Sequence, residues 1–184
     1  MSGNVSMRFV SSMEKVFPGK EPGRPIERIS ALKNERLNFQ LVVISLFERK
    51  GECKWKIKGA LASYARVRIV DFAKGYYNNR PDSDDYVIFH DCGVTLYPEI
   101  LRTPDYTDLS LYPDVFRALW ITVYAPEGLP AGEHDFTVEL CDWMGEPLAE
   151  ETLKVRIIDA ELEKNDLIVT NWLHYDCIEA YYGE

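Results

Sequence analysis

Acidic side chains at two places in the chain could support hydrolysis. Glu27 and Glu35 could form the carboxyl pair of a glycosidase, in which the two groups stand roughly 5 Å apart in retaining enzymes and farther apart in inverting ones. The sequence does not give this distance, and exposed strand carboxylates are the commoner case. Glu133 and His134 follow a turn, and nothing predicts their burial or a third group to orient them. We interpret them as the shoulder of a hairpin rather than as an acid–base pair.

Metal chemistry has weaker support. Asp82, Asp84 and Asp85 offer oxygen ligands, but a calcium loop also needs a turn glycine and a bidentate glutamate, and neither is in place. We interpret this segment as a solvated acidic loop and expect no metal and no cofactor. The four cysteines form no Cys-x-x-Cys pair and have no histidine at zinc-ligand spacing, so we expect unpaired thiols. They are Cys53, Cys92, Cys141 and Cys177.

Two further groups of side chains could face a ligand or serve the fold. The C–H face of a sugar can stack on an indole, so the tryptophans are candidate sugar platforms, although large aromatics in a sandwich more often lie in the core. The three in question are Trp55, Trp120 and Trp143. We interpret the Asn34-Glu35-Arg36 turn, together with Gln40, as structural. Its amide and guanidinium groups can form hydrogen bonds with backbone atoms where a strand begins.

The elements that must position these residues are β-strands. Residues 39–46 form a nearly continuous apolar run, which predicts a central strand buried on both faces. Other segments alternate apolar and polar residues, with turns rich in Gly and Pro between them, and no amphipathic helix is long enough to cover a core. We therefore predict an all-β fold, an antiparallel β-sandwich. The remaining predicted strands are 5–10, 27–32, 64–70, 119–125, 135–141 and 153–158.

Two segments depart from this pattern. Residues 72–114 show no clear strand but many Tyr and Asp, so we expect an ordered loop that lies on another domain or a ligand. In the tail, residues 161–184, a polar linker precedes an apolar segment from Leu167 to Tyr175, typical of a strand in a parallel sheet. We predict a sandwich over residues 1–160 and, in the tail, the first strand of a truncated second domain. The apolar tail should pack on the sandwich or on another copy.

The charge limits the partners. The net charge is −9, and the 21 Lys and Arg residues form no basic cluster, so neither nucleic acid nor an anionic membrane is an expected partner. Residues 1–10 lack the apolar core of a signal peptide, and no apolar run is long enough to cross a membrane. We expect a cytoplasmic protein, or a secreted one if a signal peptide has been removed.

Six segments, in order, resemble the N-terminal part of proteins that carry the domain of unknown function 4091. Those proteins are similar to glycoside hydrolase family 123, the β-N-acetylgalactosaminidases. The resemblance runs over most of the chain, from Val16 to its end. The segments are Val16–Pro18, Asn34–Gln40, Leu96–Leu101, Leu119–Pro126, Leu129–Glu133 and Thr170–Cys177.

The resemblance implies a β-sandwich followed by a (β/α)8 barrel, whose first strand would be the apolar segment of the tail. In that family the substrate's acetamido oxygen attacks the anomeric carbon, a barrel Asp orients that group, and an adjacent Glu is the general acid. Both acidic residues lie downstream of Glu184, so no catalytic residue carries over to this chain. His174, Tyr175 and Asp176 would lie at the end of the barrel strand where such active sites form, and could contact sugar hydroxyls. Alternatively, they only pack against neighbouring strands.

Three functions remain open. The chain could be a non-catalytic accessory domain that supports the catalytic barrel of a parent hydrolase and lines its sugar cleft with residues 72–114. It could be a free-standing carbohydrate-binding module, for example for N-acetylhexosamine glycans, which predicts exposed Trp or Tyr side chains side by side. It could also be a self-associating module that forms a homodimer through residues 167–182. In none of these is the chain itself expected to be an enzyme.

Overall fold

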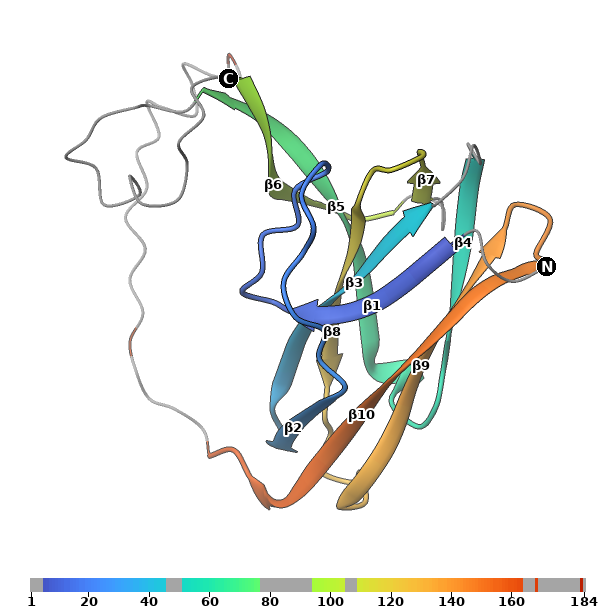
Figure 1. Cartoon of the computed structure of the whole chain (residues 1–184). Helices are drawn as coiled ribbons and strands as arrows, with labels where there is room; N and C mark the ends of the chain where they lie inside the picture. Colours follow the sequence, from blue (N-terminus) through green and yellow to red (C-terminus); the bar gives the residue numbers. More distant parts are fainter. Residues whose placement is uncertain are drawn as a thin grey trace.

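The computed structural model describes residues 5–45, 51–76, 94–104 and 109–163, together with Ile168 and Gly183. These residues form strands and one short turn of 3-10 helix, η1 (Ala62–Tyr64), so the prediction of an all-β sandwich is confirmed (Figure 1). The strands are β1 (Val5–Ser11), β2 (Arg28–Lys33), β3 (Arg36–Ser45), β4 (Gly51–Lys58), β5 (Ala65–Tyr76), β6 (Val94–Arg102), β7 (Leu109–Leu111), β8 (Arg117–Tyr124), β9 (Gly132–Asp142) and β10 (Pro147–Glu161).

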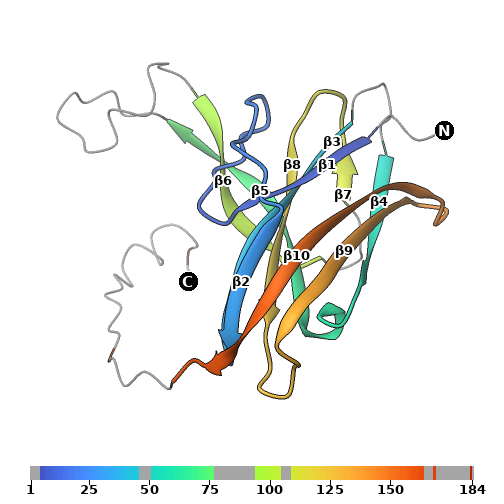
Figure 2. The same ribbon diagram turned by 60° about the horizontal axis from the view of Figure 1, so that its bottom comes forward.

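The strands form two sheets that face each other (Figures 1 and 2). The first sheet has the order β1-β3-β8-β5-β6, and the second has the order β2-β10-β9-β4-β7. Neighbouring strands pair antiparallel except β2, which joins β10 in parallel. Because β1 and β3 belong to the first sheet and β2 to the second, the chain changes sheets twice between β1 and β3.

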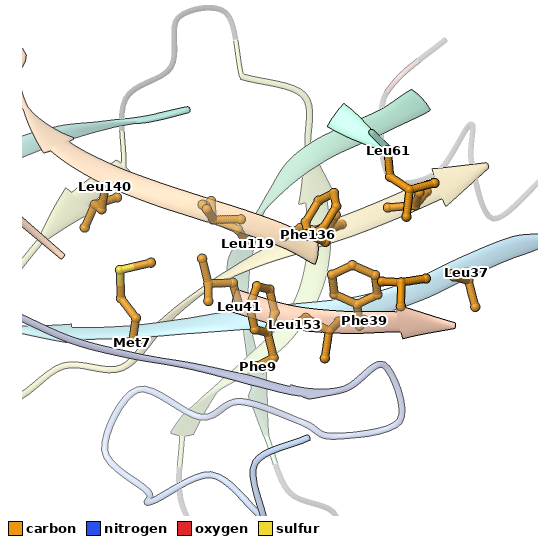
Figure 3. Close-up of a cluster of buried hydrophobic side chains, with 14 of the residues drawn as sticks. Met7, Phe9, Leu37, Phe39, Leu41, Leu61, Leu119, Phe136, Leu140 and Leu153 are labelled. Atoms are coloured by element: carbon orange, nitrogen blue, oxygen red, sulfur yellow. The ribbon is translucent and has the colours of Figure 1, made fainter. Parts of the chain in front are cut away.

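The core lies between the two sheets and is centred on three phenylalanines (Figure 3). Phe39 on β3 meets Phe9 on β1 edge to face, with ring centroids 5.6 Å apart. Phe136 on β9, in the opposite sheet, lies 5.4 Å from Phe39 and 6.4 Å from Phe9. Edge-to-face geometry suits the ring quadrupoles and adds to the burial of apolar area. The rings therefore join the two sheets at the centre of the sandwich.

Residues 39–46 were predicted as a strand buried on both faces, and β3 has this property. Phe39 and Leu41 face the core, whereas Val42 belongs to a smaller cluster on the outer side of the first sheet. Gln40 also points to that side and is buried, and its amide Nε2 donates hydrogen bonds to the backbone oxygens of Ser11 (3.2 Å) and Glu14 (2.7 Å). β3 lies inside the first sheet, and other residues cover its outer side. Both of its faces are therefore buried, which explains the unbroken apolar run.

That cover is the crossover segment, residues 12–27, which connects β1 to β2 across the outer side of the first sheet (Figure 1). Val16 inserts into the outer cluster and is fully buried. The Phe17 ring packs edge to face on Tyr97 of β6, and the Pro18 carbonyl accepts a hydrogen bond from the Phe116 amide (2.9 Å). The crossover segment thus covers one end of the outer face and leaves the other end open.

The prediction that residues 72–114 contain no clear strand is wrong. β5 continues to Tyr76, and β6 and β7 both lie within this range. The signal was hidden because β6 is an edge strand, so its apolar side chains Leu96, Ile100 and Leu101 are exposed and do not alternate. Pro98 also interrupts the pattern, at a bulge opposite Phe72.

Several predictions fall outside the described residues. Of the tail, the structure describes residues 161–163, Ile168, whose side chain is exposed, and Gly183, so the predicted barrel strand and the packing of the tail stay predictions. In the described parts of the chain, no helix is long and apolar enough to span a membrane.

Candidate functional site

The best candidate for a binding surface is the open part of the outer face of the first sheet. On the central strand β8, alternate residues fill the core, so Trp120, Thr122 and Tyr124 point outward. Trp120 is partly buried against the outer cluster, while Tyr124 is 38% exposed. The two rings therefore lie on the same face of one strand, four residues apart, with a hydroxyl between them.

The strand register places polar side chains on both sides of β8. Because β3 and β5 also alternate, their outward residues share the face of Trp120 and Tyr124. Directly opposite residues are Arg36 and Tyr124, Asn38 and Thr122, Gln40 and Trp120 between β3 and β8, and Arg66 and Thr122, Arg68 and Trp120 between β5 and β8. A row of aromatic and hydroxyl groups is thus flanked by hydrogen-bond donors on either side.

Cross-strand hydrogen bonds hold two of these side chains. The Thr122 hydroxyl donates to the Asn38 amide oxygen (2.8 Å), and the Tyr124 hydroxyl donates to the Asn34 amide oxygen (3.0 Å). Each bond uses the oxygen of its amide and leaves the amide nitrogen to donate elsewhere. The face is therefore partly pre-arranged and offers mainly donors.

Three arginines on this face have no counter-charge. Within the described ranges, Arg36, Arg66 and Arg68 form no ion pair, and no Asp or Glu occupies an outward position of β3, β8 or residues 65–70 of β5. On a protein with a net charge of −9, this is a local positive patch. Such a patch attracts anionic groups over a short range.

The outer face of the second sheet shows the contrast. Lys58 Nζ lies 2.6 Å from a Glu139 oxygen and 2.7 Å from a Glu150 oxygen. The hydrogen bonds to these two carboxylates raise the pKa of Lys58. The hydrogen bond from Lys58 in turn lowers the pKa of Glu139. Further cross-strand pairs are Lys154 with Asp135 and Arg28 with Glu133. Several charges on this face are thus paired across strands, unlike the three arginines of the first sheet.

A hollow of about 320 Å³ adjoins the open face at the edge of the crossover segment. An ion pair between Lys15 of that segment and Glu99 of β6 stands at its rim. Trp120 thus contributes both to the hollow and to the aromatic row. The lining residues are Ser12, Met13, Glu14, Lys15, Gln40, Val70, Pro98, Glu99, Leu101 and Trp120.

In the turn before β3, the predicted structural role holds for Glu35 and Gln40, whose side chains bond to backbone atoms, but not for the Arg36 guanidinium, which has no hydrogen-bond partner among the described residues. Asn34 takes a left-handed conformation with φ of 66°, and its backbone N–H donates a hydrogen bond to the Ala125 carbonyl oxygen (2.7 Å). The Glu35 carboxylate accepts a hydrogen bond from the Leu32 amide (2.7 Å). Glu35 therefore closes the turn, while the charge of Glu27 acts on Glu151 of β10. Glu35 and Glu27 thus interact with different neighbours, Leu32 and Glu151, and no contact between the two carboxylates is described.

Glu133 and His134 lie near the start of β9, but their interpretation as the shoulder of a hairpin is wrong, because the turn before β9 connects β8 of the first sheet to a strand of the second sheet. His134 Nε2 lies 2.8 Å from the Pro130 carbonyl oxygen, and Glu133 pairs with Arg28 at 3.1 Å. The tryptophans divide among three settings. Trp55 packs against the core, Trp120 lies on the outer face, and Trp143 is 66% exposed in the turn between β9 and β10. The expectation of core packing is thus wrong for Trp143.

Other candidates cannot be placed. Asp82, Asp84, Asp85, His174, Tyr175 and Asp176 all lie outside the described residues, as do Cys92 and Cys177. Cys53 and Cys141 are buried, and burial is the main cause that raises the pKa of Cys141. Among the described side chains, no three His, Cys, Asp or Glu residues are grouped so as to hold a metal ion.

The comparisons with known proteins bear on the fold. No family model matches the sequence, and no curated protein matches it. Among solved structures, the chain is similar to a family 123 glycoside hydrolase from Clostridium perfringens, studied for glycolipid glycan hydrolysis, with a TM-score of 0.60 and 10% identity. That match covers 86% of this chain and 28% of the hydrolase chain.

Other structures match with lower scores. The SrpA adhesin from Streptococcus sanguinis has a TM-score of 0.37 and 10% identity over 86% of this chain and 60% of its own. The CooA pilin subunit from enterotoxigenic Escherichia coli has a TM-score of 0.34 and 12% identity over 85% of this chain and 99% of its own. The comparisons support a fold like that of a family 123 hydrolase over 28% of its length. The resemblance to the domain of unknown function 4091 stays an interpretation of the sequence.

The arginine face was not predicted as a binding surface from the sequence. The alternation in residues 64–70 predicted Arg66 and Arg68 outward, whereas that in residues 119–125 put Trp120 and Tyr124 on one side of the strand without showing which side is buried. What the alternation did not give was the order of the strands, which brings Arg36 and Arg66 to opposite sides of β8. Neighbouring positions on this face come from three strands that are distant in sequence.

Proposed function

We propose that this chain is a non-catalytic β-sandwich domain of a glycoside-hydrolase-like protein, in which it supports a catalytic barrel. The observation that carries the proposal is the likeness of fold to the Clostridium perfringens hydrolase, which takes in 86% of this chain and only 28% of the enzyme. The six segments that resemble the domain of unknown function 4091 suggest the same position, ahead of a barrel.

The carboxylates beside the hollow support a non-catalytic role. Glu99 pairs with Lys15, and the Glu14 carboxylate accepts a hydrogen bond from the Gly23 amide (3.0 Å). A general acid or base exchanges a proton with a substrate within hydrogen-bond reach, whereas the described partners of these two groups belong to the protein itself. These two groups instead hold the crossover segment in place.

In the parent protein, the partner would be the barrel of the same polypeptide. His174, Tyr175 and Asp176 would then contact its substrate. The sandwich strands end at Glu161, which pairs with Lys33 of β2 beside the start of β3. A following domain would therefore be tethered at that end of the sandwich.

Two measurements test the proposal. A blot of the source cells with an antibody to this domain should give a band several-fold heavier than 21.2 kDa. The purified chain should not hydrolyse aryl N-acetylhexosaminides. A native band at 21.2 kDa, or a hydrolysis rate that stays with the protein through purification, would contradict the proposal.

One observation favours a second candidate, a carbohydrate-binding module. This function predicts exposed aromatic side chains side by side. On the outer face of β8, Tyr124 is exposed and Trp120, four residues away, is partly buried, and hydrogen-bond donors surround both. Both functions can hold at once, because an accessory domain can also bind the saccharide that its parent acts on.

A further inference from the structure

The open outer face of β3, β8 and β5 combines stacking surfaces with unpaired positive charge. Trp120 and Tyr124 are four residues apart on β8, so their Cα atoms are separated by about 14 Å along the strand. Arg36 lies beside Tyr124, while Arg66 and Arg68 follow the opposite side of the row. We propose that this face binds a short oligosaccharide that contains uronic acid, laid along β8 between the arginines.

The aromatic row favours a saccharide over a protein partner. Adjacent strands are about 4.8 Å apart, so the two arginine-bearing strands are separated by about 10 Å, with only β8 between them. This narrow column has the exposed Tyr124 ring at one end, the partly buried Trp120 ring at the other and the Thr122 hydroxyl in the middle. The Asn38 amide nitrogen, left free by the bond from Thr122 to its oxygen, can donate to a sugar hydroxyl.

The arginines can bind the carboxylate groups of an acidic saccharide. A guanidinium binds a carboxylate through two parallel hydrogen bonds, and this geometry gives direction as well as charge. Arg36, Arg66 and Arg68 have no acidic partner within the described residues, unlike Lys58 or Lys154 on the other sheet. Because the whole chain carries a charge of −9, most of its surface repels a polyanion, so the bound oligosaccharide would be short and confined to this face.

The inference rests on the second candidate function, carbohydrate binding, and is independent of whether a barrel follows this domain. The test is calorimetric titration of the whole chain with short oligogalacturonates. Neutral galacto-oligosaccharides, chondroitin sulfate oligosaccharides and poly-L-glutamate serve as comparison probes. We expect oligogalacturonate to bind at least about tenfold more tightly than each comparison probe, with an affinity that falls as salt is added.

Two sets of variants locate the site. The double substitution Arg66→Gln and Arg68→Gln should weaken oligogalacturonate binding at least about tenfold. The matched control, Lys54→Gln with Arg156→Gln, removes two exposed positive charges from the other sheet and should leave the affinity unchanged within about twofold. Tyr124→Leu should also weaken binding, whereas Tyr124→Phe should retain it, and circular dichroism confirms that each variant is folded.

The possible failures are distinguishable. If no saccharide binds, the carbohydrate-binding function itself is wrong, while the accessory role stands on its own measurement. Equal binding of neutral oligosaccharides keeps carbohydrate binding but overturns the acidic ligand. Preference for the sulfated probe or equal binding of polyglutamate overturns the uronate assignment, and an equal loss in the Lys54 and Arg156 control overturns the location.

Discussion

The Glu151 carboxyl group lies on β10, partly buried, near a second carboxylate. Burial raises its pKa, and the charge of Glu27 raises it further. A carboxyl group whose pKa is higher in the folded state binds protons more tightly there than in the unfolded chain. At neutral pH the ionised group therefore lowers the stability of the sandwich.

Replacing this carboxylate by an amide should stabilise the protein at neutral pH. Glu151→Gln removes the buried charge, so we expect the thermal midpoint at pH 7 to rise by about 1–3 °C. The stability of the unmodified protein falls as the pH rises from about 4.3, the ordinary pKa of Glu, through the higher folded value. The advantage of the variant should therefore shrink as the pH is lowered toward about 4.3, which thermal scans across this range would measure.

The exposed Glu161, at the end of the same strand, provides the control. Glu161→Gln should change the midpoint by less than about 1 °C at any pH in the range. If Glu151→Gln lowers the midpoint at pH 7, its carboxylate has a stabilising partner and the assigned cause of the pKa shift is wrong.

The roles of Glu35 and Gln40 could be predicted from the sequence, whereas the exposure of Trp143 could not. The structural roles of Glu35 and Gln40 were predictable, because a turn signal stands directly before the strongest strand pattern. The exposure of Trp143 was not, because the turn that carries it is sharp. The Asp142 carboxylate accepts hydrogen bonds from the Met144 and Glu146 amides and thereby turns Trp143 to solvent.

At the scale of elements, the exit from β4 depends on a single glycine. Gly59 has a φ of 107°, a backbone conformation that side chains disfavour, and an added Cβ would stand 2.1 Å from the Asp135 carbonyl oxygen. Gly59→Ala thus combines backbone strain with a clash against β9. We expect a loss of about 3 kcal/mol or more in the free energy of unfolding, measured by urea denaturation.

Two glycines in open turns are suitable controls. An added Cβ at Gly19 or Gly128 would meet no heavy atom within 4 Å. Alanine at either position should therefore change the free energy of unfolding by no more than about 0.5 kcal/mol. If Gly59→Ala also changed the free energy of unfolding by no more than about 0.5 kcal/mol, the prediction would be wrong, and the turn at residue 59 would be able to move away from β9.

The strands that were predicted and those that were missed differ in how well they are covered. The central strands β3 and β8 have a strong sequence pattern, because their inner side chains belong to the main core and some of their outer side chains belong to the outer cluster. β6 has no such constraint, because one of its edges is the edge of the sheet. In β4, Cys53, Trp55 and Ile57 do alternate with lysines, so the signal was present, and no strand was assigned there.

At the scale of the whole molecule, strand order is the part that the sequence did not give. Alternation assigns each strand an inner and an outer face, but it does not say which strands become neighbours. The parallel pairing of β2 with β10 joins two distant segments, and the crossover segment that permits it has no periodicity. The arginine face depends on this order, which is why it emerged only in three dimensions.

Cohesion of the two sheets can be tested at Phe136. Its ring is fully buried and touches Phe9 and Phe39, which belong to the opposite sheet. Phe136→Ala should lower the free energy of unfolding by about 3–5 kcal/mol, because it removes the apolar ring and leaves a cavity between the sheets.

Urea denaturation would measure this loss, with Trp143→Ala as the comparison, since that larger side chain is mostly exposed and its removal should cost less than about 1 kcal/mol. Because both substitutions remove an aromatic ring from β9 or its turn, their difference reports burial rather than residue type. Equal losses would mean that the three-ring contact does not hold the sheets together. The edges of the sandwich, where β1 approaches β10, would then have to supply that cohesion.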